Sequence, residues 1–242
     1  MTEVDSSSPV AQWVAEYPQT ARVFEQHQID YCCGGGIALA DACDKKGLDA
    51  KGVVAELTEV IADRQIEPQD NWLEAPLKEL CDHIVETHHA FLRAELPRLT
   101  GIVDKVVNAH SSKFPELVDL QRVFAELRAE LEPHMFKEEQ ILFPAIRQLE
   151  HADTLPQFPF GSVGNPIRMM EHEHDAAGGG LARIRELTGG FKPPAEACNT
   201  YLVMLDSLRG LEADLHQHIH KENFILFPRA QKLETSLNDA HG

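Results

Sequence analysis

The chain has 242 residues, of which 43% are hydrophobic and 25% charged, the balance of a globular protein that can bury a core. Its formal net charge is −17, and without an evident basic patch this disfavours binding to nucleic acid or to an anionic membrane. The sequence contains no apolar run of the roughly 20 residues that span a bilayer, and its N-terminus does not have the pattern of a secretory signal. The five cysteines do not have the spacing of a disulfide framework, which favours a reducing cytoplasm.

Helical patterns run along the sequence and strand patterns are almost absent, which predicts an all-α fold. Residues 1–65 are predicted to form a small helical domain with a Gly-rich turn, "CCGGG", and a polar, proline-containing linker is expected at residues 66–75. Residues 76–233 are predicted to form an antiparallel four-helix bundle, followed by a tail at 234–242. Its long helices are expected at about 75–109, 114–149, 165–190 and 195–233.

The predicted bundle contains an internal repeat. "HMFKEEQILFP" at residues 134–144 recurs as "HIHKENFILFP" at residues 218–228, an offset of 84 residues. Upstream, "ETHHAFLRAELPRL" aligns with "EHEHDAAGGGLARI" at an offset of 85, which places His89 on His174. Each half of the bundle therefore carries one histidine and, further along the chain, a His-x-x-x-Glu pair. Such a duplication predicts two helix pairs that close around a pseudo-twofold axis.

The repeated histidines and glutamates have the spacing of metal ligands. Residues four apart lie on the same face of a helix, so each His-x-x-x-Glu pair presents both side chains together. One copy is more often a surface ion pair, but two copies with an upstream histidine each favour a metal site. The predicted ligands are His89, His134, Glu138, His174, His218 and Glu222. Imidazole and carboxylate ligands suit iron or manganese, and glutamates that bridge two ions, with an oxo, hydroxo or water bridge, would complete the coordination.

Several other side chains accompany these predicted ligands. Three carboxylates are expected to orient a ligating histidine or to line a path for iron: Glu130, Asp214 and Glu173. Lys137 and Glu139 are expected to face water. Some histidines neighbour the predicted ligands and are possible alternates: His88, His172, His216 and His220. The others are expected to be exposed or structural: His27, His83, His110, His151 and His241.

Two helix breakers lie beside predicted ligands. Pro133 directly precedes His134, and an interior proline is expected to kink a helix at a cost of about 3 kcal/mol. Gly178–Gly180 follow His174, and three glycines inside a helix cost roughly 2–3 kcal/mol relative to alanine. Close helix packing and a helix that opens locally both explain the glycines, and the sequence leaves these alternatives open.

The cysteines divide into two groups. Cys32 and Cys33 are adjacent on the Gly-rich turn and are expected to be exposed. A redox role, a contact with a partner or a soft metal, and simple tolerance by the turn remain open for them. The other three lie in helical patterns and are expected to be small buried side chains: Cys43, Cys81 and Cys198.

The motif "DYCCGG" at residues 30–35, followed by "HMFKEEQILFP", "EHEHDAAG" and "HIHKENFILFP", resembles the bacterial iron–sulfur cluster repair family. Its members are also called regulators of cell morphogenesis and nitric oxide signalling. The resemblance extends from about residue 9 to residue 230, and it implies a hemerythrin-like bundle whose iron ligands are the six side chains that the repeat predicts. It also implies two non-haem iron ions, a cytoplasmic stress-response role, and a contribution from Cys32 and Cys33.

The function that this resemblance implies is repair of iron–sulfur clusters damaged by nitric oxide or peroxide, through iron supplied by the di-iron centre. Its partners would be damaged or apo iron–sulfur proteins, and the chain would be a monomer or a homodimer. Two alternatives remain open at this point. A reduced di-iron site can reduce nitric oxide to nitrous oxide, which would make the protein an enzyme, or it can bind and sense oxygen or nitric oxide as hemerythrin does.

Overall fold

The computed structural model describes residues 4–63 and 71–239. Within these ranges the regular structure is helical, and strand-type pairing is limited to two isolated bridges, Pro9–Ala38 and Phe158–Gly161. The prediction of an all-α fold is confirmed. Residues 66–70 of the predicted linker and 240–242 of the predicted tail lie outside the described residues. Among the helices described, none has the length and apolar character needed to cross a bilayer.

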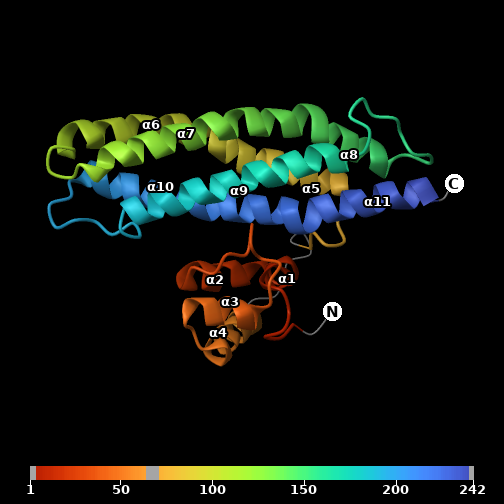
Figure 1. The fold of residues 1–242 in the computed structure, drawn as a ribbon, viewed down its shortest axis with the longest axis horizontal. Helices are drawn as coiled ribbons and strands as arrows, with labels where there is room; N and C mark the ends of the chain where they lie inside the picture. The colour runs from red at the N-terminus through yellow and green to blue at the C-terminus, as the bar shows by residue number, and fades with distance from the viewer. Residues whose placement is uncertain (1–3, 64–70, 240–242) are drawn as a thin grey trace. The chain divides into compact units, whose positions relative to one another are not determined.

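The chain forms two compact units. One contains the described residues up to Cys81 together with residues 146–163 and 216–239. Its N-terminal part is a group of short helices, drawn in red and orange in Figure 1: α1 (Val10–Glu16), η1 (Pro18–Thr20), α2 (Ala21–His27), α3 (Leu39–Lys46) and α4 (Ala50–Asp63). Trp13, Phe24 and Tyr31 are almost completely buried in this unit. These aromatic side chains supply much of the apolar area that stabilises such short helices.

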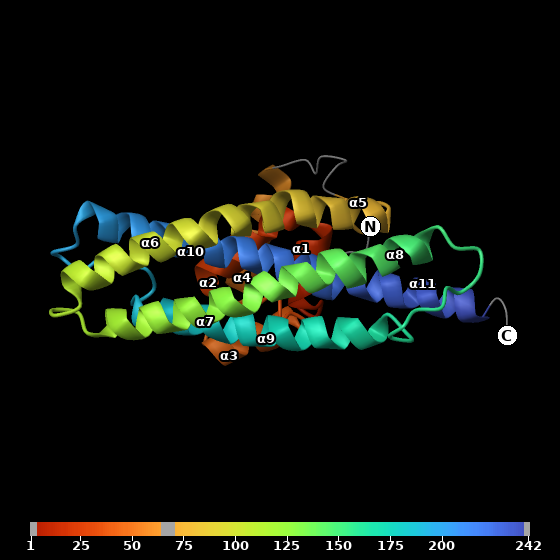
Figure 2. The same ribbon diagram turned by 90° about the horizontal axis from the view of Figure 1, so that it is seen from above.

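The other unit contains residues 82–145 and 164–215 and is built from long helices. Its helices run lengthwise side by side in both Figure 1 and Figure 2: α6 (Ala90–His110), α7 (Glu116–Lys137), α9 (Gly164–Leu187) and most of α10 (Asn199–Lys221). Along α6, Leu92, Leu96 and Leu99 are buried at helical spacing. That spacing gives the helix one apolar face, which is what a bundle needs.

Short π-helical turns interrupt the α-helical pattern where the predicted ligands occur. They are η3 (Ile84–His89), between α5 (Leu77–His83) and α6; η4 (Glu138–Leu142), before α8 (Phe143–Glu150); and η5 (Glu222–Leu226), before α11 (Phe227–Asp239). The N–H of Phe143 donates to the carbonyl of Glu138, five residues back, and the N–H of Phe227 donates to that of Glu222. Single π-helical turns of this kind are frequent at functional sites.

The helix breakers do not end their helices. α7 continues through Pro133 to Lys137, and the pattern changes only at the π-helical turn that begins with Glu138. α9 likewise continues through Gly178–Gly180. A Cβ at Gly180 would lie 3.6 Å from Leu127 Cδ1, an ordinary contact, and a Cβ at Gly179 would meet no atom within 4 Å. Close packing therefore does not require glycine at either of these two positions.

Candidate metal centre

Three predicted histidine ligands gather around one buried glutamate. His89 Nε2 lies 3.3 Å from Glu138 Oε2, and His134 Nε2 lies 3.1 Å from Glu138 Oε1. His174 Nε2 lies 3.1 Å from His134 Nε2. These four side chains come from η3, α7, η4 and α9, and their exposed fractions are between 0% and 3%. The π-helical turns matter here because they offset the helical register at His89 and Glu138.

The second His-x-x-x-Glu pair has nearly the same local geometry. His218 Nε2 lies 3.3 Å from Glu222 Oε1, and both side chains are almost completely buried. Two groups of buried side chains offer one ligand atom per residue within 4.8 Å of one another: His89, Glu138, His218 and Glu222, and His134, Glu138, His174 and Glu222. The two groups share both glutamates. All six side chains that the repeat predicts occur in these groups, so the chain holds a cluster of histidine and glutamate suited to metal binding.

Two further carboxylates fix the orientation of two of the predicted ligand imidazoles. His89 Nδ1 lies 2.7 Å from Glu139 Oε1, and Arg93 also donates to Glu139. His134 Nδ1 lies 2.8 Å from Glu173 Oε2, and Lys137 also donates to Glu173. A carboxylate that accepts a hydrogen bond from the Nδ1–H leaves Nε2 free to bind a metal, so both rings are held in the tautomer that a metal needs.

The environment keeps these two carboxylates ionised. Burial alone would raise the pKa of Glu139, but the hydrogen bonds from His89 and Arg93 outweigh burial and lower this pKa below its usual value. The same balance, with Lys137 and His134 as donors, lowers the pKa of Glu173. An ionised carboxylate on Nδ1 also increases the basicity of Nε2, which strengthens its bond to a metal.

Of the three carboxylates predicted to accompany the ligands, only one contacts a predicted ligand. Glu173 contacts a predicted ligand, as described above. Asp214 lies 2.9 Å from Nδ1 of His88, which is not a predicted ligand, and Glu130 is solvent-exposed. Glu139 was expected to face water, and this expectation is wrong, because its side chain is only 18% exposed and bonds His89. The position of Glu139 directly after the predicted ligand Glu138 could have indicated its role. In an α-helix, however, adjacent side chains point in different directions, and only the π-helical turn brings both toward His89.

The cysteine turn lies in the same compact unit as His218 and Glu222. Asn223 Nδ2 donates to the carbonyl of Cys32 at 3.1 Å, and His220 Nε2 lies 2.9 Å from the carbonyl of Ala11. The Tyr31 ring packs edge-on against His220 with centroids 5.7 Å apart. Burial lowers the pKa of His220 to about 4, so this ring is neutral, and its Nε2–H donates a hydrogen bond to the carbonyl of Ala11. The turn is therefore packed against the helix that carries His218 and Glu222.

The two adjacent cysteines have different environments. Cys32 is buried, which contradicts the expectation of exposure, whereas Cys33 is partly accessible. The carboxylate of Asp30 accepts hydrogen bonds from the backbone N–H groups of Cys32, Cys33 and Gly34. The hydrogen bond with Cys33, followed by burial, raises the pKa of Cys32 well above its usual value. Cys32 is therefore a protonated thiol at neutral pH, and the five cysteines, all among the described residues, form no disulfide.

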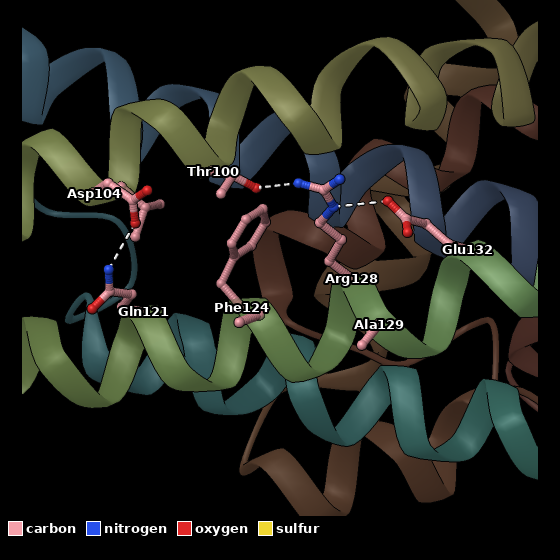
Figure 3. Close-up of a pocket in the computed structure, with 9 residues that line it drawn as sticks. Thr100, Asp104, Gln121, Phe124, Arg128, Ala129 and Glu132 are labelled. Atoms are coloured by element: carbon pink, nitrogen blue, oxygen red, sulfur yellow. Dashed lines mark hydrogen bonds and ion pairs between the residues drawn. The ribbon is translucent and has the colours of Figure 1, made fainter.

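A separate pocket of about 260 Å³ opens between α6 and α7 (Figure 3). Arg128 donates to Thr100 at 2.9 Å and to Glu132 at 2.8 Å, and Gln121 donates to Asp104 at 2.7 Å. These polar groups satisfy one another, and none of the predicted metal ligands lines the pocket. It is not the candidate site.

Comparisons with known proteins agree with this architecture. The family model described as "Hemerythrin HHE cation binding domain" matches residues 81–230, and a model described as a domain of unknown function matches residues 6–61. A protein of Escherichia coli named iron-sulfur cluster repair protein YtfE is 39% identical over 222 residues, which cover 92% of this chain and 96% of the relative. Its namesake in Citrobacter koseri is 38% identical over the same shares. The chain belongs to the hemerythrin HHE family and, within it, to the iron–sulfur cluster repair proteins.

Proposed function

We propose that this protein is a non-haem di-iron protein that repairs iron–sulfur clusters damaged by nitrosative or oxidative stress. The observation that carries the proposal is the buried cluster of histidine and glutamate, whose two groups share Glu138 and Glu222. Family membership and the name of the relatives support the repair role. Two iron ions, with an oxo or hydroxo bridge, would take the six side chains as ligands: His89, His134, Glu138, His174, His218 and Glu222.

The donor set fits iron. The groups offer only imidazole nitrogen and carboxylate oxygen, a set of ligand atoms that suits non-haem iron. Structural zinc sites, by contrast, commonly contain cysteine thiolates. Glu138 and Glu222 have an exposed fraction of 0%, and a carboxylate so deeply buried is stabilised when it binds a cation. When bound, the iron would supply the metal that a damaged cluster has lost. Glu139 and Glu173 hold the imidazoles of His89 and His134 in place, so these side chains would keep their orientation when iron is bound and when it is given up.

The partners that we propose are damaged or apo iron–sulfur proteins in the cytoplasm, with the chain acting as a monomer or a homodimer. In the N-terminal helical region, Cys33 is the better candidate than Cys32 for contact with a partner, because Cys32 is buried and protonated. Exchange of the Cys33 thiol with an exposed disulfide of a partner would form a new S–S bond to Cys33, release the other partner sulfur as a thiol, and leave Cys32 in place within its hydrogen bonds to Asp30.

Iron transfer to an acceptor tests the repair function. The full-length protein, loaded anaerobically with ferrous iron, is incubated with an apo iron–sulfur protein and a sulfide source, and cluster formation is followed by absorbance. For the wild type we expect about two irons per chain and transfer of iron to the acceptor. In Glu138→Ala and in Glu222→Ala we expect loss of iron binding and therefore of iron transfer. His151→Gln, which changes an exposed histidine, serves as the control and should behave as the wild type. Retention of iron in the presence of a competent acceptor would contradict the donor role.

A second candidate function is reduction of nitric oxide, favoured by the fact that the two ligand groups share both glutamates. Two ions held as neighbours can each provide one electron, and two nitric oxide molecules with two electrons and two protons give nitrous oxide and water. Gas analysis of the headspace above the reduced, iron-loaded protein tests this directly. Absence of nitrous oxide with a fully loaded site would exclude it.

A further inference from the structure

The one exposed cysteine of the chain lies at the start of α10, in contact with a histidine at the end of α6. Cys198 was expected to be a small buried side chain, but it is exposed and directly precedes the first residue of the helix, Asn199. Its Sγ lies 3.2 Å from Nε2 of His110, the last residue of α6. Both residues belong to the unit of residues 82–145 and 164–215, and neither occurs in the metal-binding groups.

Two helix ends favour opposite charges on this pair. The N-terminus of a helix stabilises a negative charge, and Cys198 stands at the N-terminus of the 23-residue α10. The C-terminus of a helix stabilises a positive charge, and His110 ends the 21-residue α6. The hydrogen bond from His110, together with the backbone N–H groups of Thr200 and Tyr201, lowers the pKa of Cys198 to about 7. The pair therefore has the arrangement of a thiolate that accepts a hydrogen bond from a histidine N–H.

The surroundings leave the sulfur accessible and the local charge balanced. The Tyr201 ring packs edge-on against His110 with centroids 5.6 Å apart, which supports the orientation of the imidazole. Lys113 and Glu196, on the segments that flank the pair, form an ion pair with each other. By contrast, Cys32, Cys43 and Cys81 are buried and Cys33 is only partly accessible.

We propose that Cys198 and His110 form a modification site that takes up small-molecule disulfides such as glutathione disulfide by thiol–disulfide exchange. The Cys198 thiolate attacks one sulfur of the disulfide, the S–S bond breaks, and a new S–S bond joins Cys198 to half of the reagent. The other half leaves as a thiolate and takes up a proton from the solvent. Cys198 is oxidised, the released half is reduced to a thiol, and no further oxidant is needed.

The rate of modification against pH tests this proposal. The full-length protein is incubated with glutathione disulfide at a series of pH values from 5 to 9, and the modified peptide is quantified by mass spectrometry. In the wild type we expect Cys198 to be the main site at pH 7 and the rate to reach half of its maximum near pH 7. In His110→Gln the midpoint should move toward the ordinary thiol value of about 8.5.

The expected size of the effect follows from two opposing factors. At pH 7 the thiolate fraction falls from about one half to about 3% when the pKa rises from 7 to 8.5. A more basic thiolate is also more nucleophilic, so the net loss of rate in His110→Gln is about threefold to fourfold. His151→Gln, which changes an exposed histidine elsewhere, should leave the rate unchanged. Equal profiles for wild type and His110→Gln, a wild-type midpoint near that of an ordinary thiol, or modification mainly at another cysteine would each overturn the proposal.

Discussion

The two copies of the repeated segment differ at positions that are not predicted metal ligands. At equivalent positions, Phe136 of the first copy is 64% exposed, whereas His220 of the second is buried and bound to Ala11. Glu139 of the first copy bonds the predicted ligand His89, whereas its counterpart Asn223 bonds the carbonyl of Cys32. The histidine and glutamate of each copy nevertheless keep nearly the same separation, 3.1 Å and 3.3 Å.

This difference shows that the two copies of a duplicated helix can share one function and differ in a second. The positions that would bind metal stay constant, because both copies must present the same ligand atoms. The remaining positions are free to diverge, so the first copy provides a carboxylate that orients an imidazole and the second packs against the cysteine turn. The copies should therefore respond alike to changes at the ligands and differently to changes at the divergent positions.

Removal of the repeated histidine should have the largest effect and should not distinguish the copies. We expect His134→Ala and His218→Ala each to lower the iron content from about two per chain to one or fewer, because each would remove a nitrogen ligand that no neighbouring side chain replaces. Metal analysis and Mössbauer spectroscopy of the full-length variants measure this. Full iron loading in either variant would show that the histidine replaced in it is not a required ligand.

Replacement of Glu139 should weaken iron binding without removing a ligand. Glu139→Gln keeps the size of the side chain but loses the charge that holds Nδ1 of His89, and loss of such a partner typically costs 10- to 100-fold in metal affinity. The matched change in the second copy, Asn223→Ala, should leave the affinity within about twofold, because Asn223 bonds a backbone carbonyl. Competition with a chelator measures both affinities. Equal losses in the two variants would contradict the division of tasks between the copies.

For the free energy of unfolding, a change in the second copy should have a larger effect than the equivalent change in the first copy. His220→Ala removes a buried ring and leaves the Ala11 carbonyl without its donor, which together should cost about 2–4 kcal/mol. The equivalent change in the first copy, Phe136→Ala, removes an exposed side chain and should stay within about 0.5 kcal/mol. Urea unfolding followed by circular dichroism compares the free energies of unfolding. A His220→Ala variant as stable as the wild type would show that this contact does not hold the N-terminal helices.

The sequence carries the information for the helices and for the six predicted ligands because both depend on spacing. Apolar side chains at helical spacing define the bundle, and a His-x-x-x-Glu pair places two side chains on one face wherever it occurs. Glu139, Cys198 and Glu130 could not be placed in this way. The orientation of Glu139 depends on a π-helical turn, the exposure of Cys198 on where α10 begins, and that of Glu130 on which face of α7 is covered. These are properties of packing between elements, which local spacing does not encode.

The glycines of the second copy offer the smallest and most specific test of the comparison. Gly179 occupies the position of Ala94 in the first copy, and a Cβ added to Gly179 would meet no atom within 4 Å. Since α9 continues through this residue, Gly179→Ala should stabilise the protein by about 0.5–1 kcal/mol, the difference in helix propensity. Urea unfolding gives the change in stability, and iron content should be unaltered. If the variant gained stability but bound iron less well, the flexibility of glycine beside His174 would itself be needed for the site, and the two halves would differ in dynamics as well as in their outer contacts.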